Sequence, residues 1–223
     1  MLVLGIDDAG RGPIIGPMVM AGVLIDSKEE PKLKSLGVKD SKQVIQNKRV
    51  LLAEEIRKIA ISYHVVTIHP NEIDGREAGG LNLNKLEAVK AALIINQLNK
   101  TNEKIKVVID CPSTNIKKWE SYLKGYVEKT ENLDFFVEHK ADVNHVSCSA
   151  ASILAKVTRE EEVEKIKKRI GKDFGSGYPS DPVTKKFIEE HGKKHKKDGI
   201  IRETWATWQN QKAKKSQLKL NEF

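Results

Sequence analysis

The sequence predicts an α/β domain whose sheet is partly antiparallel. Short apolar, β-branched runs alternate along the chain with longer segments in which apolar residues recur every three or four positions. This alternation is typical of strands and helices that follow one another in an α/β protein. The first two apolar runs are separated by a short turn region only, so these strands lack room for a helical crossover and should pair antiparallel.

Five strands are expected. The first run ends at two adjacent acids, and the second follows a turn region that contains Gly12-Pro13 and Gly16-Pro17. The third alternates and is rich in β-branched residues, which favours a strand. The fourth ends at Asp110, and the fifth is another short apolar run. These strands should cover residues 2–7, 18–25, 61–69, 105–109 and 133–137.

The expected helices show apolar residues at spacings of three and four. The clearest case is 83–98, where Leu86, Val89 and Leu93 fall on one face. The whole set covers residues 47–60, 83–98, 146–169, 183–191 and 202–214. Apolar anchors become few after about Gly171. We therefore expect a domain over 1–170, a basic helical C-terminal region over 171–215 and a short tail over 216–223.

Charge and composition narrow the class of partner. The 223-residue chain is 39% hydrophobic and 31% charged and carries a net charge of +8, with a pI of about 9.3. Residues 183–219 contain eleven Lys and Arg against four Asp and Glu, so most of the excess lies there. Such a cationic region favours a polyanion such as nucleic acid, although a solvated helix face has the same composition.

A soluble, cytoplasmic monomer is expected. No apolar run approaches 18 residues, and no basic segment precedes the first one, so membrane spanning and secretion are disfavoured. The two cysteines, Cys111 and Cys148, do not form a CxxC pair, which argues against a zinc site or a disulfide framework.

Four acids at three positions are candidate metal ligands. Asp7 and Asp8 end the first strand, where two like charges are costly unless a cation is near. Asp110 ends another strand, and neighbouring strands lie ~4.8 Å apart, close enough for two such acids to share a cation. Asp142 precedes the long helix. A strand-to-turn residue for Asp110 and a helix-start residue for Asp142 are the plainer alternatives.

Several motifs in a fixed order identify a resemblance to a known family. The chain resembles archaeal-type ribonuclease HII, a type 2 ribonuclease H, over nearly all of its length. The motifs that carry this resemblance are Gly5-Ile6-Asp7-Asp8-Ala9-Gly10-Arg11-Gly12, Val38-Lys39-Asp40-Ser41-Lys42, Val108-Ile109-Asp110, Lys140-Ala141-Asp142, the run from Ser149 to Arg159, Gly175-Ser176-Gly177-Tyr178-Pro179-Ser180-Asp181-Pro182 and Arg202-Glu203-Thr204-Trp205.

The resemblance implies a ribonuclease H-like fold, a mixed five-stranded sheet flanked by helices, with the catalytic domain in residues 1–170. It implies that Asp7, Asp8, Asp110 and Asp142 are catalytic and bind Mg²⁺ or Mn²⁺. It also implies cleavage of the RNA strand in RNA–DNA hybrids and 5′ to ribonucleotides embedded in duplex DNA, by two-metal-ion hydrolysis, with a role in DNA replication and repair. Relatives usually carry Glu where this chain has Asp8, so we expect Mn²⁺ to support activity at least as well as Mg²⁺.

The resemblance also implies substrate contacts. The backbone of Gly10, Arg11 and Gly12 would read the 2′-hydroxyl, although a tight turn explains these glycines too. Tyr178 would stack on the sugar, with a loop aromatic that fills the core as the alternative. Ser41 and Lys42 suit a phosphate contact, or Lys42 is simply solvated.

Four further positions stand out by their helical spacing. Lys156 and Arg159 share a helix face and could reach a phosphate, but surface charges are the simpler interpretation. Trp205 and Trp208 also share a face and are expected to pack the C-terminal region rather than stack on bases.

The last residues match a short docking peptide. Gln217, Leu220 and Phe223 have the spacing of the sliding-clamp-binding sequence Q-x-x-[apolar]-x-x-aromatic, with one aromatic where two are usual. Two other functions stay open. A ribonuclease H-like junction resolvase or integrase would use the acids without reading a 2′-hydroxyl, and a non-catalytic hybrid-binding module would bind without cutting.

Overall fold

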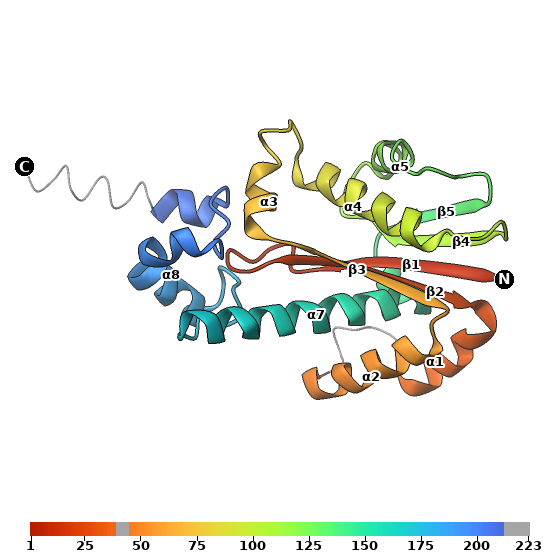
Figure 1. Ribbon diagram of the computed structural model, residues 1–223, viewed down its shortest axis with the longest axis horizontal. Helices are drawn as coiled ribbons and strands as arrows, with labels where there is room; N and C mark the ends of the chain where they lie inside the picture. The colour runs from red at the N-terminus through yellow and green to blue at the C-terminus, as the bar shows by residue number, and fades with distance from the viewer. Residues whose placement is uncertain (39–44, 212–223) are drawn as a thin grey trace, which may run out of the picture. The chain divides into compact units, whose positions relative to one another are not determined.

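The computed structural model describes residues 1–38 and 45–211, and it contains a five-stranded sheet in the order β3-β2-β1-β4-β5 (Figure 1). The sheet is mixed: β1 pairs antiparallel with β2 and parallel with β4, and β4 pairs parallel with β5. The strands are β1 (Leu2–Ala9), β2 (Met18–Asp26), β3 (Ser62–Ile68), β4 (Ile105–Asp110) and β5 (Leu133–Glu138). The expected strand set and the antiparallel first pair are therefore confirmed.

Eight α-helices have fully described bounds: α1 (Glu30–Leu36), α2 (Gln46–Ile59), α3 (Pro70–Gly75), α4 (Leu83–Leu98), α5 (Ile116–Lys124), α6 (Ala141–Asn144), α7 (Val146–Ile170) and α8 (Pro182–His195). A further helical segment covers residues 206–211. The amphipathic helix expected over 83–98 is α4, and the long helix expected from Val146 is α7.

The chain forms two compact units that interleave along the sequence. The first unit contains residues 1–9, 19–67 and 81–158, and the second contains residues 10–18, 68–80 and 159–223. Residues 10–18 and 68–80, which lie inside the 1–170 range expected for the catalytic domain, thus make most of their contacts with the C-terminal part of the chain.

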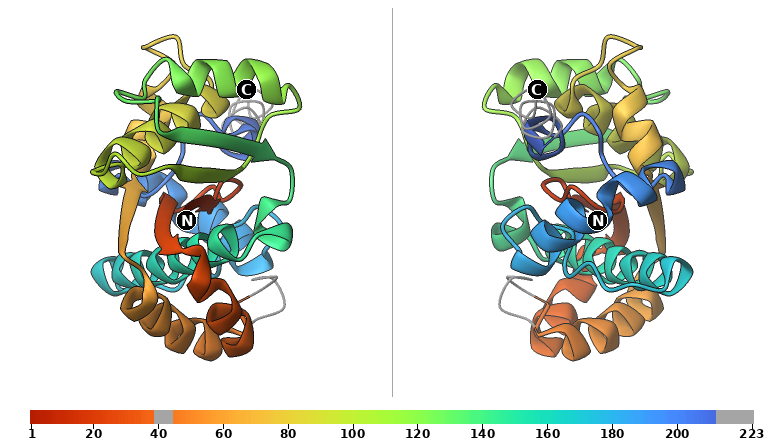
Figure 2. Two further views of the ribbon diagram at one scale, coloured as in Figure 1. Left: turned by 90° about the vertical axis from the view of Figure 1, so that its right-hand side faces the viewer. Right: turned by 90° about the vertical axis from the view of Figure 1, so that its left-hand side faces the viewer.

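The first unit places the sheet between two layers of helices. Helices α4 and α5 cover one face, and α1, α2 and the first part of α7 cover the other, as both right-angle views show (Figure 2). On the second face Val23 and Ile25 of β2 pack against Ile56 of α2 and the fully buried Ile153 and Leu154 of α7. The small, apolar first half of α7 allows this helix to lie flat on the strands.

The second unit has its own core and is held together by backbone hydrogen bonds. Ile14 and Ile15 pack with Phe174, Phe187 and Ile188 of the C-terminal region. The Ile14 N–H donates to the Gly177 carbonyl at 2.8 Å, and the Gly16 N–H donates to the Ile200 carbonyl at 2.8 Å. These bonds explain why the β1–β2 connection belongs to this unit.

The helix expected over 202–214 begins later than the sequence pattern indicated. Residues 202–205 form a turn, and helix begins at residue 206. The reason is a bridge between Ile15 and Ile201, after which the Arg202 N–H donates to the Ile14 carbonyl at 2.9 Å instead of entering a helix.

Candidate active site

Asp7 and Asp110 lie at the carboxyl ends of neighbouring parallel strands. The last registered pair between β1 and β4 is Ile6 with Ile109, and each aspartate is the next residue of its strand. Residues opposite one another in a parallel pair project from the same face, so the two carboxylates face the same side of the sheet. Asp7 is 6% exposed, and one of its carboxylate oxygens accepts the Asp8 N–H at 2.8 Å.

Asp142 is brought to the same region by the short helix α6. The Ala141 N–H donates to the Asp110 carboxylate at 3.3 Å, which joins the start of α6 to the end of β4. The Asp142 carbonyl accepts the Ser149 hydroxyl at 2.7 Å, so α7 holds the other side of this turn. Asp142 is 3% exposed.

The pKa of the buried Cys148 thiol is affected by three of the acids. Burial raises its pKa well above the usual value, and the charges of Asp7, Asp110 and Asp142 raise it further. Because these charges act on one thiol, the three acids lie in the same region of the first unit. The raised pKa keeps Cys148 a neutral thiol, whose Sγ–H donates to the Ile6 carbonyl at 3.1 Å, and argues against a nucleophilic role.

The environment of Asp7 disfavours the charged form of its carboxyl group. Burial raises the pKa of its carboxyl well above the usual value, the charges of Asp8 and Asp110 raise it further, and a hydrogen bond from Ser152 opposes these effects. Within the described ranges, no three Asp, Glu, His or Cys side chains converge tightly enough to form a ready-made metal site. Their charges nevertheless act on one another, since those of Asp8 and Asp110 raise the pKa of Asp7, so the acids share one region without a preformed cluster.

A glycine on β1 allows α7 to approach these acids. A Cβ atom at Gly5 would overlap the backbone of Ser147 and Cys148, so only glycine permits this contact. The close approach places Ser152, one turn further along α7, within hydrogen-bonding reach of Asp7. Ser152 was not singled out in the sequence, although the spacing of small residues from Ser147 to Ser152 is the signal of such a contact.

In the second unit, the loop that follows β1 is held by a buried arginine. Arg202 is fully buried and donates to the carbonyls of Gly10 at 2.7 Å, Arg11 at 2.9 Å and Gly16 at 3.0 Å. The Trp205 indole N–H donates to the Gly12 carbonyl at 3.2 Å. Gly10 has φ +82°, a conformation that suits glycine. All three carbonyls of the Gly10-Arg11-Gly12 motif are thus anchored.

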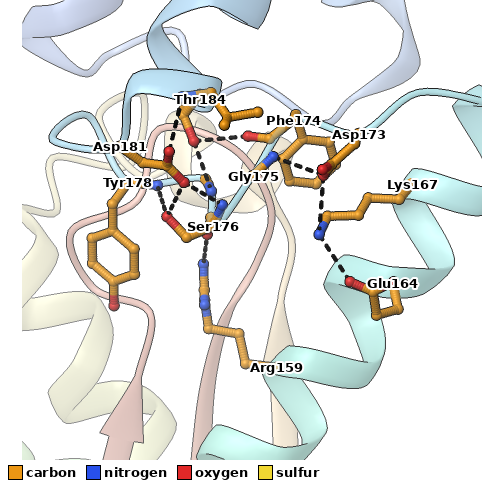
Figure 3. A network of polar contacts seen from close by, with 12 residues as sticks. Arg159, Glu164, Lys167, Asp173, Phe174, Gly175, Ser176, Tyr178, Asp181 and Thr184 are labelled. Atoms are coloured by element: carbon orange, nitrogen blue, oxygen red, sulfur yellow. Dashed lines mark hydrogen bonds and ion pairs between the residues drawn. The ribbon is translucent and has the colours of Figure 1, made fainter.

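Tyr178 is held near this loop, inside the same unit. A Cβ atom on Gly12 would lie 3.5 Å from the Tyr178 ring, and the Arg159 guanidinium lies 5.2 Å from the ring centroid. Arg159 also donates to the Ser176 carbonyl at 3.0 Å (Figure 3). Tyr178 is 38% exposed, so its ring does not fill the core as the alternative interpretation required.

The turn that carries Tyr178 is fixed by Asp181. Its carboxylate accepts the Ser176 N–H and hydroxyl, each at 2.7 Å, and the Val183 N–H at 2.9 Å (Figure 3). These bonds lower the pKa of Asp181 to about 2. The Thr184 hydroxyl completes the turn, since it donates to the Phe174 carbonyl at 2.8 Å and accepts the Gly177 N–H at 3.0 Å.

The remaining predicted site residues are partly buried in the second unit and partly outside the described residues. Arg159, interpreted from spacing as a surface charge, is only 8% exposed, because it lies under Tyr178 and against Gly10. Trp208 is buried in the core of the second unit, which confirms its packing role. The predicted phosphate contacts and clamp-binding residues lie outside the described residues: Ser41, Lys42, Gln217, Leu220 and Phe223.

A mixed five-stranded sheet with acids at the ends of its central strands defines the class of ribonuclease H-like nucleases. The crystal structure of the ribonuclease H2 from Pyrococcus horikoshii OT3 matches with a TM-score of 0.83 at 39% identity, over 96% of this chain and 98% of that one. The structure of the PCNA:RNase HII complex from Archaeoglobus fulgidus matches with a TM-score of 0.80 at 38% identity, over 92% and 95%.

The sequence comparisons narrow this class to one family. The sequence model of ribonuclease HII matches residues 4–208. The ribonuclease HII of Pyrococcus furiosus is 45% identical over 228 aligned residues, which cover 100% of this chain and 98% of that protein. The chain therefore belongs to the ribonuclease HII family. Members of this family are endonucleases that degrade the RNA of RNA–DNA hybrids. In the part of the chain that the structure describes, no helix is long and apolar enough to span a membrane.

Proposed function

We propose that this protein hydrolyses the RNA strand of RNA–DNA hybrids and cuts duplex DNA 5′ to an embedded ribonucleotide, leaving 3′-hydroxyl and 5′-phosphate ends. The observation that carries the proposal is that Asp7 and Asp110 follow the last pair of β1 and β4, and that Ala141, next to Asp142, donates to Asp110, in a chain of this family. Asp8, adjacent to Asp7, supplies the fourth carboxylate.

The chemistry of these residues fits hard divalent cations. Their donors are carboxylate oxygens, the ligands that Mg²⁺ and Mn²⁺ prefer. Burial and the charges of Asp8 and Asp110 raise the pKa of Asp7, and a nearby cation would oppose both effects. Two bound cations would activate water and stabilise the leaving 3′-oxygen. We propose that Asp7, Asp8, Asp110 and Asp142 hold them.

Asp8 distinguishes this chain from the usual family pattern. Its carboxylate reaches roughly 1.3–1.5 Å less far than that of the usual Glu, by one methylene. Mg²⁺ tolerates such a displacement poorly because it requires near-ideal octahedral geometry. We expect Mn²⁺ to support cleavage at least as well as Mg²⁺, and Asp8→Glu to shift the preference towards Mg²⁺. A clear Mg²⁺ preference of the unaltered protein would contradict this explanation.

The anchored loop suggests how a ribose is read. In a trans peptide the N–H points opposite to the C=O. Because the carbonyls of Gly10 and Arg11 point to Arg202, the N–H groups of Arg11 and Gly12 point away from it. We propose that these N–H groups donate to the 2′-hydroxyl and that the exposed Tyr178 ring packs on the adjacent sugar.

The decisive experiment uses a DNA duplex with one internal ribonucleotide, incubated in Mg²⁺ and in Mn²⁺. A cut 5′ to the ribonucleotide, absent on an all-DNA duplex and lost in Asp110→Asn, would support the proposal. Cleavage of the all-DNA duplex would favour a resolvase or integrase. Tight binding without a cut in either metal would favour a hybrid-binding module.

A sliding clamp is the protein partner that we propose for the tail. The support is the tail sequence together with the PCNA complex of the similar Archaeoglobus fulgidus protein. Isothermal titration of the full chain with an archaeal clamp tests it. We expect Phe223→Ala to abolish binding and Lys219→Ala, the matched control, to retain it. Equal clamp affinities of the two variants would contradict the proposal that the tail binds the clamp.

A further inference from the structure

A groove of about 710 Å³ lies in the first unit, between the start of α4 and the length of α5. Its lining includes Lys85, Ser113, Asn115, Lys118, Tyr122 and Tyr126. No carboxylate is among the described residues that line it. No residue proposed above as a metal ligand or ribose reader lines the groove. Metal binding and ribose recognition therefore do not explain it.

The two lysines of the groove, Lys85 and Lys118, differ from those helical lysines of this protein that pair with a glutamate. Lys58, Lys124 and Lys165 each pair with a glutamate one turn away on their own helix, at 2.6–2.7 Å. Neither Lys85 nor Lys118 makes an ion pair with any described residue. Lys85 instead lies over the Tyr122 ring, 5.5 Å from its centroid. The groove therefore carries uncompensated positive charge, which favours an anionic occupant.

The backbone adds to this potential. Both α4 and α5 begin at the groove, with the side chains of Asn82 and Asn115 as their caps. Helix N-termini carry a partial positive charge and expose N–H groups. The Trp119 indole N–H donates to the Asn84 carbonyl at 2.8 Å, which ties α5 to the start of α4 and fixes the width of the groove.

A pair of tyrosines forms the far end of the groove. The rings of Tyr122 and Tyr126 lie 5.2 Å apart, and their hydroxyls are 3.0 Å apart. Tyr126 is 46% exposed. Lysines and tyrosine hydroxyls are common donors to the phosphates and sugars of nucleic acids. Together they favour a phosphodiester backbone over a compact small anion, because the groove runs along α5, whose nine residues span about 13 Å.

The groove starts close to the proposed catalytic acids. Ser113 follows Asp110 by three residues, which limits their separation to about 11 Å. We propose that this groove binds the phosphodiester backbone of one duplex arm that extends from the cleavage site, through Lys85, Lys118 and Tyr126. The inference rests on the proposed function. At about 3.4 Å per nucleotide, the groove spans roughly four nucleotides of that arm.

The test is binding of a labelled 20-base-pair duplex with a central ribonucleotide, measured by fluorescence anisotropy without divalent cation at several salt concentrations. We expect Lys85→Gln with Lys118→Gln in the full chain to raise Kd about 5- to 10-fold at moderate salt. The slope of log Kd against log salt should fall by about two, one per lost phosphate contact. The matched control is Lys58→Gln, an exposed helical lysine of α2, which should change neither quantity.

Trimming the duplex locates the contact. When the arm on one side of the ribonucleotide is cut to two base pairs, the double variant and the unaltered protein should bind alike, while trimming the other arm should preserve the difference. With the full-length duplex under cleavage conditions, KM should rise and kcat should stay unchanged. Unchanged Kd and salt slope, or a loss that persists whichever arm is trimmed, would overturn the inference. Failure of the unaltered protein to cut would instead reject the proposed function, which this binding assay does not test.

Discussion

Arg202 shows how a single buried residue can set the geometry of a loop that lies far away in sequence. Its guanidinium satisfies three carbonyls of the loop that follows β1, and it lies 4.9 Å from the centroid of the Trp205 ring. Only the planar fork of an arginine matches several acceptors at fixed angles, so lysine is no equivalent here.

Replacing Arg202 by Lys should therefore cost both stability and discrimination. We expect a loss of about 2–4 kcal/mol in the free energy of unfolding, because buried carbonyls lose their donors. The ratio of cleavage at a ribonucleotide to cleavage at its 2′-O-methyl analogue should also fall. Urea unfolding and paired cleavage assays measure the two effects. Arg169→Lys, at an exposed residue with one carbonyl contact, is the control and should change stability by under ~0.5 kcal/mol. Equal behaviour of the two variants would contradict the anchoring role.

Asp181 gives a prediction about pH. Its folded-state pKa of about 2 lies below the ordinary value of roughly 3.9, so its bonds stabilise the fold above pH ~4 and are lost as pH falls through about 2. Solvent screening around this side chain limits the effect to about 1 kcal/mol. Asp181→Asn should thus be less stable than the parent at pH 6, and the difference should shrink by pH 3. Urea unfolding at both pH values measures it. A difference that is independent of pH would mean that charge is not the cause.

At the scale of elements, the contact of β1 with α7 determines where the acids lie. The strand brings Asp7 and Asp8, the helix brings Ser152 and supports Asp142, and Gly5 permits their approach. A change in the packing of β1 against α7 should therefore also move the acids of the candidate active site.

Gly5→Ala should consequently lower both the stability of the protein and its cleavage activity. The added methyl group has no space, and overpacking of this kind costs about 1–3 kcal/mol. We expect a lower unfolding midpoint and reduced cleavage, because α7 must move away from Asp7. Gly75→Ala is the control, since a Cβ atom there meets nothing within 4 Å. Thermal unfolding and single-turnover cleavage measure the outcome. An unchanged midpoint in Gly5→Ala would show that α7 adapts freely.

Elements with a long periodic pattern were predictable from sequence, and short ones were not. Helix α4 has sixteen residues, and its bounds match the prediction, although its buried face includes Glu87 and leaves Leu93 exposed. Helices α1, α3 and α6 have seven, six and four residues, too few to show a period. Helix α5 was missed although Ile116, Trp119 and Leu123 have helical spacing, because charged residues surround them.

Among the candidate site residues, the acids at strand ends could be identified from the sequence. The buried arginines that hold the nearby loops in place could not. Asp7 and Asp110 could be identified because each directly follows an apolar run that the sequence predicts as a strand, and Asp7 is followed by a second acid. Arg159 and Arg202 look like surface charges in a basic chain, and only the fold shows that they are buried. Long-range hydrogen bonds such as that from Arg202 to Gly10 leave no local signal in the sequence.

At the scale of the whole molecule, the two units interleave along the chain. The second unit takes residues 10–18 and 68–80 from within the sequence of the first and joins them to residues 159–223. The bonds of Ile14 with Gly177 and of Asp74 with Glu203 and Thr204 are examples of these connections.

A chain truncated after residue 170 should therefore be unstable. It would keep the sheet but lose the partners of residues 10–18, including Arg202 and the core around Phe174. We expect rapid proteolysis at 10–18 and 68–80 under conditions in which the full chain resists. A chain truncated after residue 215, which lacks only the tail, is the control. Limited proteolysis followed by mass spectrometry compares them, and a protease-resistant 1–170 fragment would contradict this expectation.

The interleaving of the units also affects how the protein matures on the ribosome. Residues 10–18 emerge early, but Arg202 follows about 190 residues later. At about 5–20 residues per second this delay is roughly 10–40 s. For that time the newborn chain has the acids of β1 without the anchored loop beside them in sequence. The nascent protein should thus gain its selectivity for ribose only after the last part of the chain has been translated.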